Sequence, residues 1–257
     1  GLTLANVIGV PLGTYVGQSF NWGVSFLLVG VVGVMAVLSI KFWMPVLPKS
    51  SANGFKKDLK VFKRTEFWLV FLLTSIGTGG FFAWYSYIAP LITEVAGHPE
   101  SIITYIMILA GLGMVIGNFA GAKLAEKFSP INAVVITLVI MVILLIANTF
   151  FASNKIAVII MTFLISITAF CIATPIQMAM IKTSKGSEML GSSMNQSAFN
   201  MGNASGAYFA GLPIALGYGF TSATLVGAVM AGMGVFIALA IILLRKKKSL
   251  SLVPVEA

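Results

Sequence analysis

Eight long apolar stretches constrain what this sequence can fold into. A hydrocarbon layer of roughly 30 Å is crossed by about 20 apolar residues in a helix, and only 9% of the residues are charged while 58% are hydrophobic. A soluble domain carries about 25% charged residues. The sequence therefore predicts an all-α polytopic membrane protein with eight transmembrane helices. The stretches cover residues 1–17, 23–44, 67–92, 101–122, 132–151, 156–181, 190–214 and 220–244.

The first stretch is short for a transmembrane helix. Its 17 residues, at about 1.5 Å each, reach only about 25 Å, and no initiating Met precedes them. We expect this stretch to be the end of a longer helix and the chain to be part of a longer protein.

The basic residues fall on one side of the predicted membrane topology. If eight helices cross and both chain ends share a side, Lys155 is the one basic residue of 16 on the opposite side. Positive residues favour the cytoplasmic side, so the net charge of +9 reflects topology, and no nucleic-acid partner is expected. We predict a multi-pass protein of the plasma membrane, in bacteria the inner membrane, with both ends of the chain in the cytoplasm.

The longest polar interruption, residues 47–66, divides the chain. Phe55, Leu59 and Phe62 follow helical spacing within its basic part, which is typical of an amphipathic helix on an anionic membrane surface; a disordered basic linker is the alternative. Residues 1–46 then hold two helices of one half, residues 67–248 hold six helices of the other, and residues 249–257 form a cytoplasmic tail.

The predicted helices differ in polarity. Residues 23–40, 133–147 and 223–244 are almost wholly apolar or small, whereas the other helices carry amide and aromatic side chains. Because polar groups are costly in lipid, the polar helices should line an interior and the apolar ones should face lipid. One outer helix in every three indicates an architecture of three-helix units.

A glycine–proline pattern marks the first helix. Gly9 and Gly13 are four residues apart and form a flat packing surface, and Pro11 between them should kink the helix. The stretch "NVIGVPLGTYVGQ" resembles the antiporter motif of the major facilitator superfamily, in its drug:proton antiporter and arabinose-efflux-permease-like branch. The resemblance implies a twelve-helix fold of which this chain holds helices five to twelve, and a motif that biases transport toward export. Ordinary small-residue packing is the alternative.

A second stretch, "GNFAGAKLAEKFSP", resembles the loop signature of the same family. On that pattern Gly117 and Gly121 allow close approach of a neighbouring helix, and Glu126 and Lys127 occupy the acid and base positions that latch helix ends. Phe128-Ser129-Pro130 departs from the usual basic ending. A surface charge pair without consequence is the alternative.

The polar side chains of three helices are candidates for a substrate cavity. Gln196, Asn200 and Asn203 follow a spacing that places them on one helix face, and buried amides there need a partner, either a substrate or another helix. Trp84 and Tyr85 lie in "GTGGFFAWYSYIAP", where glycines and a proline should break the helix, as in the seventh helix of the family; an aromatic belt at the membrane interface is the alternative. Gln177 follows Pro175 and corresponds to the tenth helix of the family.

The predicted function is secondary active transport of a small organic molecule, such as a drug, sugar or metabolite, by alternating access. The resemblance implies export in exchange for protons and a monomer at full length. All seven acidic residues lie in loops or at helix ends, so the proton-carrying carboxylate is expected outside this sequence. An importer of the same fold and a channel remain alternatives. An enzyme is not expected, and neither is a cofactor or a metal, because no His, Cys or acid cluster lies at membrane depth.

Overall fold

The computed structural model describes residues 9–45 and 59–250, and these form helices without a strand among them. The bounds of the helices before the long bundle helices are α2 Val10–Ser19, α3 Trp22–Trp43, the 3-10 turn η2 Leu59–Lys63, α5 Thr65–Leu72, the π-helix η3 Leu73–Gly77, α6 Thr78–Tyr85, α7 Ile88–Pro90, the π-helix η4 Leu91–Val95 and the 3-10 turn η5 Glu100–Ile102. The remaining helices are α8 Ile103–Phe128, α9 Pro130–Phe151, α10 Lys155–Cys171, α11 Ala173–Thr183, α12 Glu188–Ala215 and α13 Ser222–Leu250.

In the part of the chain that the structure describes, eight helical passes correspond to the eight predicted stretches. Six of them are long and apolar enough to cross a membrane: α3, α5 with η3 and α6, η5 with α8, α9, α10 with α11, and α13. The helix α12 is 28 residues long and falls outside that group because several amide, Ser and Gly residues lower its hydrophobicity. The first pass is described only as α2, since residues 1–8 lie outside the described part of the chain.

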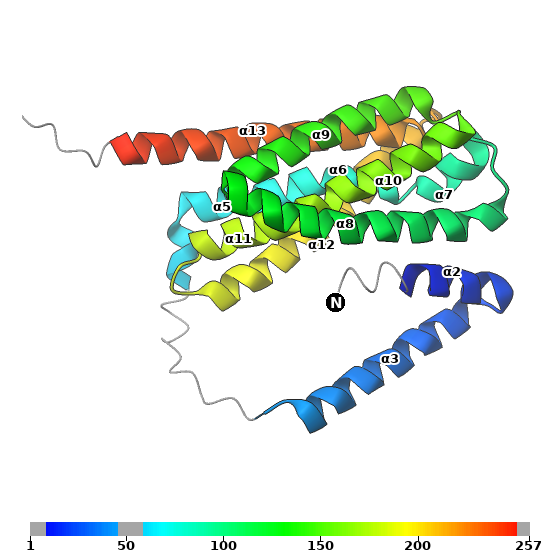
Figure 1. The fold of residues 1–257 in the computed structure, drawn as a ribbon, viewed down its shortest axis with the longest axis horizontal. Coiled ribbons are helices and arrows are strands. Elements are labelled where there is room, and N and C mark those ends of the chain that lie inside the picture. Colours follow the sequence, from blue (N-terminus) through cyan, green and yellow to red (C-terminus); the bar gives the residue numbers. More distant parts are fainter. Residues whose placement is uncertain (1–8, 46–58, 251–257) are drawn as a thin grey trace, which may run out of the picture.

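The helices from α5 to α13 form one bundle with α6 at its centre (Figure 1). In this bundle α6 packs against both α12 and α13, α8 packs against α10, and α9 packs against α13. The largest fully buried side chains include Trp84 on α6, Leu138 and Met141 on α9, and Ile165 on α10.

Glycines bring the backbones of α6 and its neighbours into contact. A Cβ atom added to Gly80 would lie 2.6 Å from the carbonyl oxygen of Gly227 on α13, and one added to Gly202 on α12 would lie 2.7 Å from that of Ser75. Close packing of this kind is a main source of helix association in lipid, where burial of apolar surface offers little. The glycines of this segment therefore hold the bundle together.

The helix is broken within this segment, as the sequence predicts, but near the proline and not at Gly79 and Gly80. It runs through Gly79 and Gly80 to Tyr85 and is interrupted at Ser86 and Tyr87, just before Pro90. Because a glycine between closely packed helices gains contacts along its backbone, the cost of its flexibility is offset there.

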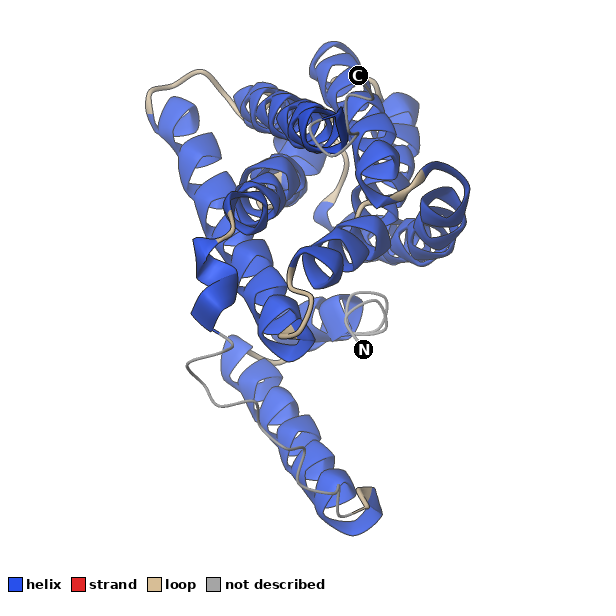
Figure 2. Ribbon diagram, turned by 90° about the vertical axis from the view of Figure 1, so that its left-hand side faces the viewer, coloured by secondary structure: helices blue, strands red, loops and turns tan. Residues whose placement is uncertain are grey.

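The helices α2 and α3 leave the bundle. The described part of α2 lies against α8, whereas α3 has no buried residue, and Figures 1 and 2 show it extending away from the other helices. The apolar helix α13 has one exposed stripe, which includes Val229, Phe236 and Leu243, and buries its opposite face. These exposed apolar faces suit contact with lipid or with further helices.

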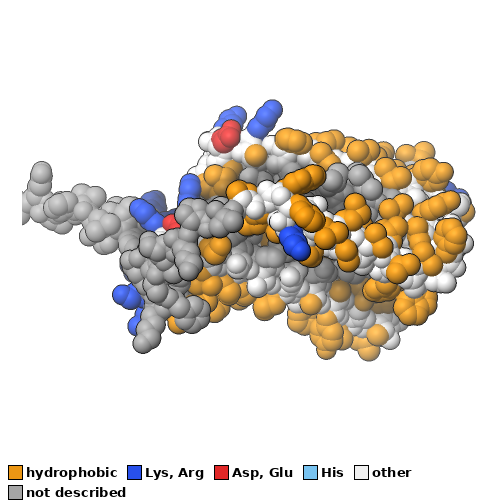
Figure 3. Space-filling model, turned by 90° about the horizontal axis from the view of Figure 1, so that it is seen from below, with side chains coloured by type: hydrophobic (Ala, Val, Ile, Leu, Met, Phe, Trp, Pro, Cys, Tyr) orange, Lys and Arg blue, Asp and Glu red, His pale blue; other side chains and the backbone are white. Residues whose placement is uncertain are grey.

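Basic side chains gather at one end of the bundle, which is called the basic end below (Figure 3). The opposite end holds Lys155, whose backbone oxygen lies 3.0 Å from Nε2 of His98. The predicted amphipathic helix lies mostly in residues 46–58, outside the described residues. Its described part is the 3-10 turn η2, where Val61 is buried and Leu59 is exposed.

Candidate functional site

A cavity of about 400 Å³ opens between α6, α8, α9, α10, α11 and α12. The described residues that line it are aromatic, apolar, hydroxyl or amide residues, and none of them is charged. Four phenylalanines form the aromatic part of the lining: Phe81, Phe82, Phe170 and Phe199. Four amides form the polar part: Asn118, Gln177, Asn195 and Gln196. Such a wall can hold an uncharged or weakly polar organic molecule by ring contacts and hydrogen bonds.

A chain of hydrogen bonds fixes two of these amides. Asn195 donates its side-chain N–H to Oε1 of Gln177, and Gln177 donates to the Ser192 hydroxyl at 2.8 Å. On the other side, the Thr74 hydroxyl in η3 lies 3.3 Å from Oδ1 of Asn195. Each bond satisfies a polar group in the cavity wall, so this chain joins α11, α12 and η3.

Local hydroxyl bonds accompany the π-helix beside the cavity. Thr74, Ser75 and Thr78 each donate to the carbonyl oxygen four residues earlier, at 2.9, 2.9 and 2.6 Å. Hydroxyls that bond back to the preceding turn bend helices, and π-helical turns are frequent at functional sites. The irregular turn places Asn195 and Thr74 within reach of each other.

Trp84 and Tyr85 lie behind the lining. Trp84 is only 1% exposed, and neither residue lines the cavity. Tyr85 stacks on Phe81 with ring centroids 5.0 Å apart, and Trp84 lies 5.9 Å from the same ring. These two aromatic residues therefore position Phe81, which forms part of the wall.

Gln196, Asn200 and Asn203 share the exposed side of α12, and only Gln196 lines the cavity. The buried side of α12 carries Gly202 and Gly206, where an added Cβ atom would collide with the backbone of the helix formed by η3 and α6.

Asn195 on that buried side is a cavity amide that the sequence prediction omitted. Its spacing of seven residues from Gly202 was a usable signal, since residues seven apart lie on one helix face. Asn118 and Phe81 were also omitted, and nothing local in the sequence separates them from the amides and phenylalanines around them.

The glycine–proline motif lies in α2, outside the cavity. The described part of α2 begins at Val10 and has Pro11 in its first turn. The helix direction before Gly9 lies outside the described residues, so the kink expected from Pro11 remains a prediction. Apart from the neighbouring residues and the nearby backbone of the same helix, no heavy atom of the described residues lies within 4 Å of a Cβ atom added to Gly9 or Gly13. The Ser25 hydroxyl of α3 donates to the carbonyl oxygen of Gly13 at 3.1 Å. The motif therefore leaves an open, flat surface here.

The loop motif lies at the basic end of α8. Added Cβ atoms on Gly117 and Gly121 would each collide with the backbone of α10, at Ile167 and Cys171. Glu126 is exposed, and no described residue forms an ion pair with it. Lys127 is exposed too and lies 5.2 Å from the ring of its neighbour Phe128.

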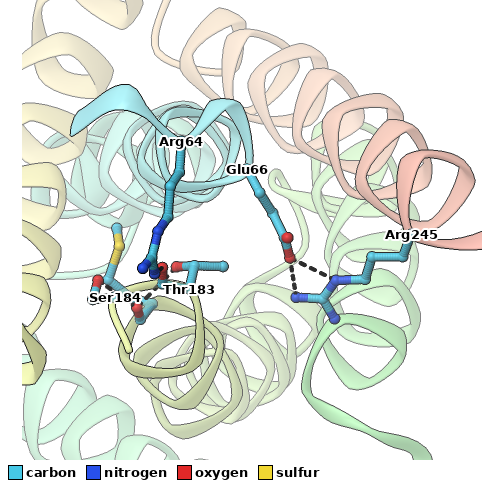
Figure 4. A network of polar contacts seen from close by, with 6 residues as sticks. Arg64, Glu66, Thr183, Ser184 and Arg245 are labelled. Carbon is cyan, nitrogen blue, oxygen red and sulfur yellow. Dashed lines mark hydrogen bonds and ion pairs between the residues drawn. The ribbon is translucent and has the colours of Figure 1, made fainter. Parts of the chain in front are cut away.

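Polar contacts between other residues join helix ends at the basic end (Figure 4). Arg64, just before α5, donates to the carbonyl oxygens of Thr183 and Lys185 at 2.8 and 3.3 Å. Glu66 accepts from Arg245 of α13 at 2.6 and 2.7 Å. These contacts join the ends of α5, α11 and α13, which are far apart in the sequence.

Among the described residues, no three His, Cys, Asp or Glu side chains come together as metal ligands.

Comparison with known proteins shows that this chain is similar to transporters. The sequence profile of the Major Facilitator Superfamily matches residues 1–195. The chain is 34% identical to AraJ of Escherichia coli (strain K12) over 231 residues, which are 90% of this chain and 59% of AraJ. It is 33% identical to the inner membrane transport protein YdhP of the same strain over 237 residues, which are 92% of this chain and 61% of YdhP. The chain thus spans about three fifths of the length of these relatives.

A solved structure shows the same fold. The transporter FucP of the Major Facilitator Superfamily, in its outward conformation, superposes with a TM-score of 0.65 at 19% sequence identity. The superposition covers 84% of this chain and 53% of FucP. At this identity the likeness concerns the fold alone.

Proposed function

The chain belongs to the Major Facilitator Superfamily, and on that premise we propose that it forms the larger part of a secondary active transporter that exports a small organic molecule. The eight helices correspond to helices five to twelve of a twelve-helix fold. Residues 1–46 belong to the first half, residues 47–66 to the linker, residues 67–248 to the second half and residues 249–257 to the tail. The two halves alternate access to a central site.

The observation that carries this proposal is the uncharged cavity in the bundle. Gln177, Gln196 and Phe81 line one space among α6, α11 and α12, and transporters built from inverted repeats hold their substrate sites at the interface between the repeats. We assign substrate contact to Gln177 and Gln196. Asn200 and Asn203, on the exposed side of the same helix, contact the substrate or the first half of the fold.

Protons are the proposed coupling ion. The cavity lining among the described residues holds no carboxylate, so the titrating group belongs to the other half of the site. We further propose that the protein lies in the bacterial inner membrane as a monomer, with the basic end in the cytoplasm. The positive-inside rule supports this orientation. The location in the inner membrane is supported by the relative YdhP, which is named an inner membrane transport protein.

Efflux measurements with the natural full-length protein test this function. Cells that overproduce it should accumulate less of at least one labelled sugar or drug from a panel than cells that lack it, and an uncoupler should abolish the difference. Gln196→Ala should lower the export rate, because its amide faces the cavity. Ser197→Ala is the matched control, because its exposed hydroxyl bonds within its own helix, at 3.1 Å from the Ser193 oxygen.

The same measurements separate the alternatives. Uptake that is higher in the overproducing cells, and that survives Pro11→Ala, would establish an importer. Flux that does not saturate, together with single-channel steps in planar bilayers, would establish a channel.

A further inference from the structure

A second open cleft, of about 930 Å³, lies at the basic end between the start of α5, the end of α11 and the end of α13. It is distinct from the substrate cavity, since no residue lines both. Five positive side chains and one carboxylate line it: Arg64, Lys182, Lys185, Arg245, Lys247 and Glu66.

The single carboxylate of the cleft is already paired. Glu66 accepts two hydrogen bonds from Arg245, so the other four positive charges have no carboxylate partner within the cleft. Like charges brought together repel unless a counter-ion joins them. This cleft therefore favours a bound anion.

The arginines are held in place, whereas two lysines are available. Arg64 donates to two backbone oxygens of the turn after α11, which fixes its guanidinium at the rim (Figure 4). Lys182 and Lys247 are exposed, and neither has a hydrogen bond or ion pair with a described residue. Lys185 interacts with Glu188 outside the cleft. Two ammonium groups on a preformed frame can thus donate to a phosphate.

The cleft lies next to an apolar helix face, which suits the acyl chains of a lipid, whereas a free ion would need no such face. Leu244 lines the cleft, and the exposed stripe of α13 continues from it along the membrane-spanning part through Leu243 and Phe236, which are 67% and 74% exposed. Basic clefts between helix ends, next to an apolar helix face, bind anionic lipid headgroups.

We propose that this cleft binds the phosphate of an anionic phospholipid, with the headgroup against Lys182 and Lys247 and the acyl chains along α13. The bound lipid ties the ends of α5, α11 and α13 together. This site does not depend on the direction of transport or on the transported molecule.

Native mass spectrometry of the detergent-purified chain tests the proposal. Dioleoyl phosphatidylglycerol should bind more tightly than dioleoyl phosphatidylcholine. The double variant Lys182→Gln/Lys247→Gln should bind phosphatidylglycerol about thirtyfold more weakly, since each of the two lysines near an anionic lipid surface contributes about 1 kcal/mol and about 1.4 kcal/mol corresponds to a factor of ten. The variant Lys123→Gln/Lys127→Gln is the matched control: it removes two exposed lysines of the basic end that lie outside the cleft, and its binding should remain unchanged.

Three results would overturn the proposal. The first is equal binding of the two lipids, and the second is an equal loss of binding in both double variants. The third is displacement of phosphatidylglycerol by inorganic phosphate at the same concentration, which would make the cleft a site for a free anion. Circular dichroism and the melting temperature of each variant should match those of the unmodified chain, because all four lysines are exposed.

Discussion

The side-chain amide of Asn195 on α12 donates a hydrogen bond to Oε1 of Gln177 on α11, within the wall of the cavity. Asn195 is 2% exposed, and Gln177 uses its own N–H to reach Ser192. One hydrogen-bonded pair thus links the two helices and orients an amide toward the cavity. It connects the stability of the fold with the geometry of the candidate site.

Asn195→Ala should lower the free energy of unfolding by about 1–3 kcal/mol, because it removes the donor to Oε1 of Gln177 and the hydrogen bonds of a side chain that is almost fully buried. The measurement is unfolding by a denaturing detergent, followed by circular dichroism. Asn200→Ala on the same helix is the control and should change stability by less than about 0.5 kcal/mol, since Asn200 is exposed. Equal effects of the two variants would contradict the assigned role of Asn195.

Two glycines of α13 should respond to alanine with opposite signs. A Cβ atom on Gly227 would lie 2.5 Å from the carbonyl oxygen of Gly80, whereas one on Gly232 would have no heavy atom of the described residues within 4 Å. Gly227→Ala should therefore destabilise the protein by about 1–3 kcal/mol, as overpacking does. Gly232→Ala should stabilise it by about 0.4–1 kcal/mol by restricting the unfolded chain. The melting temperatures of the two variants test this contrast.

The ion pair between Glu66 and Arg245 should contribute little to stability. Both side chains are 38% exposed, and exposed pairs contribute under about 1 kcal/mol. A double-mutant cycle with Glu66→Gln and Arg245→Gln should give a coupling free energy in that range, which decreases with added salt. A coupling above about 3 kcal/mol would instead mean that the pair is desolvated, as in buried ion pairs.

Glu188 at the start of α12 should make stability depend on pH in the acid range. The backbone N–H of Gly186 donates to its Oε1 atom at 2.8 Å. This bond, then the N–H of Glu188 itself, and to a smaller extent the charge of Lys185, lower the pKa of the carboxyl group, while partial desolvation opposes them. A carboxylate with a lowered pKa in the folded state stabilises the protein above the ordinary pKa of glutamate, and this contribution disappears as the pH falls through the folded-state pKa.

The difference in melting temperature between the unmodified chain and Glu188→Gln should therefore be constant near neutral pH and shrink toward zero in acid. Glu126→Gln is the control, because Glu126 is exposed and has no hydrogen bond with a described residue. A difference for Glu188→Gln that persists unchanged down to pH 3 would show that the Gly186 bond does not act through the carboxylate charge.

The membrane crossings could be predicted from the sequence because they depend on local properties. A helix such as α9 needs only enough consecutive apolar residues, and the predicted stretch 132–151 and the helix Pro130–Phe151 differ by two residues at one end. The segment 67–92 was also predicted as a transmembrane helix, but its glycines were interpreted as positions at which the helix breaks. Their close contact with Gly202 and Gly227 depends on helices more than 100 residues away in the sequence.

The sequence by itself determined the helical class, the membrane crossings and the separation of charge, since each follows from composition along a short stretch. Only the tertiary structure decided that α12 buries its glycines and Asn195 and leaves Asn200 and Asn203 exposed. In lipid both faces of a helix meet apolar surroundings, so hydrophobic periodicity does not mark the buried face. The close fit of small residues against a neighbouring backbone marks it, and that fit exists only once the helices are packed.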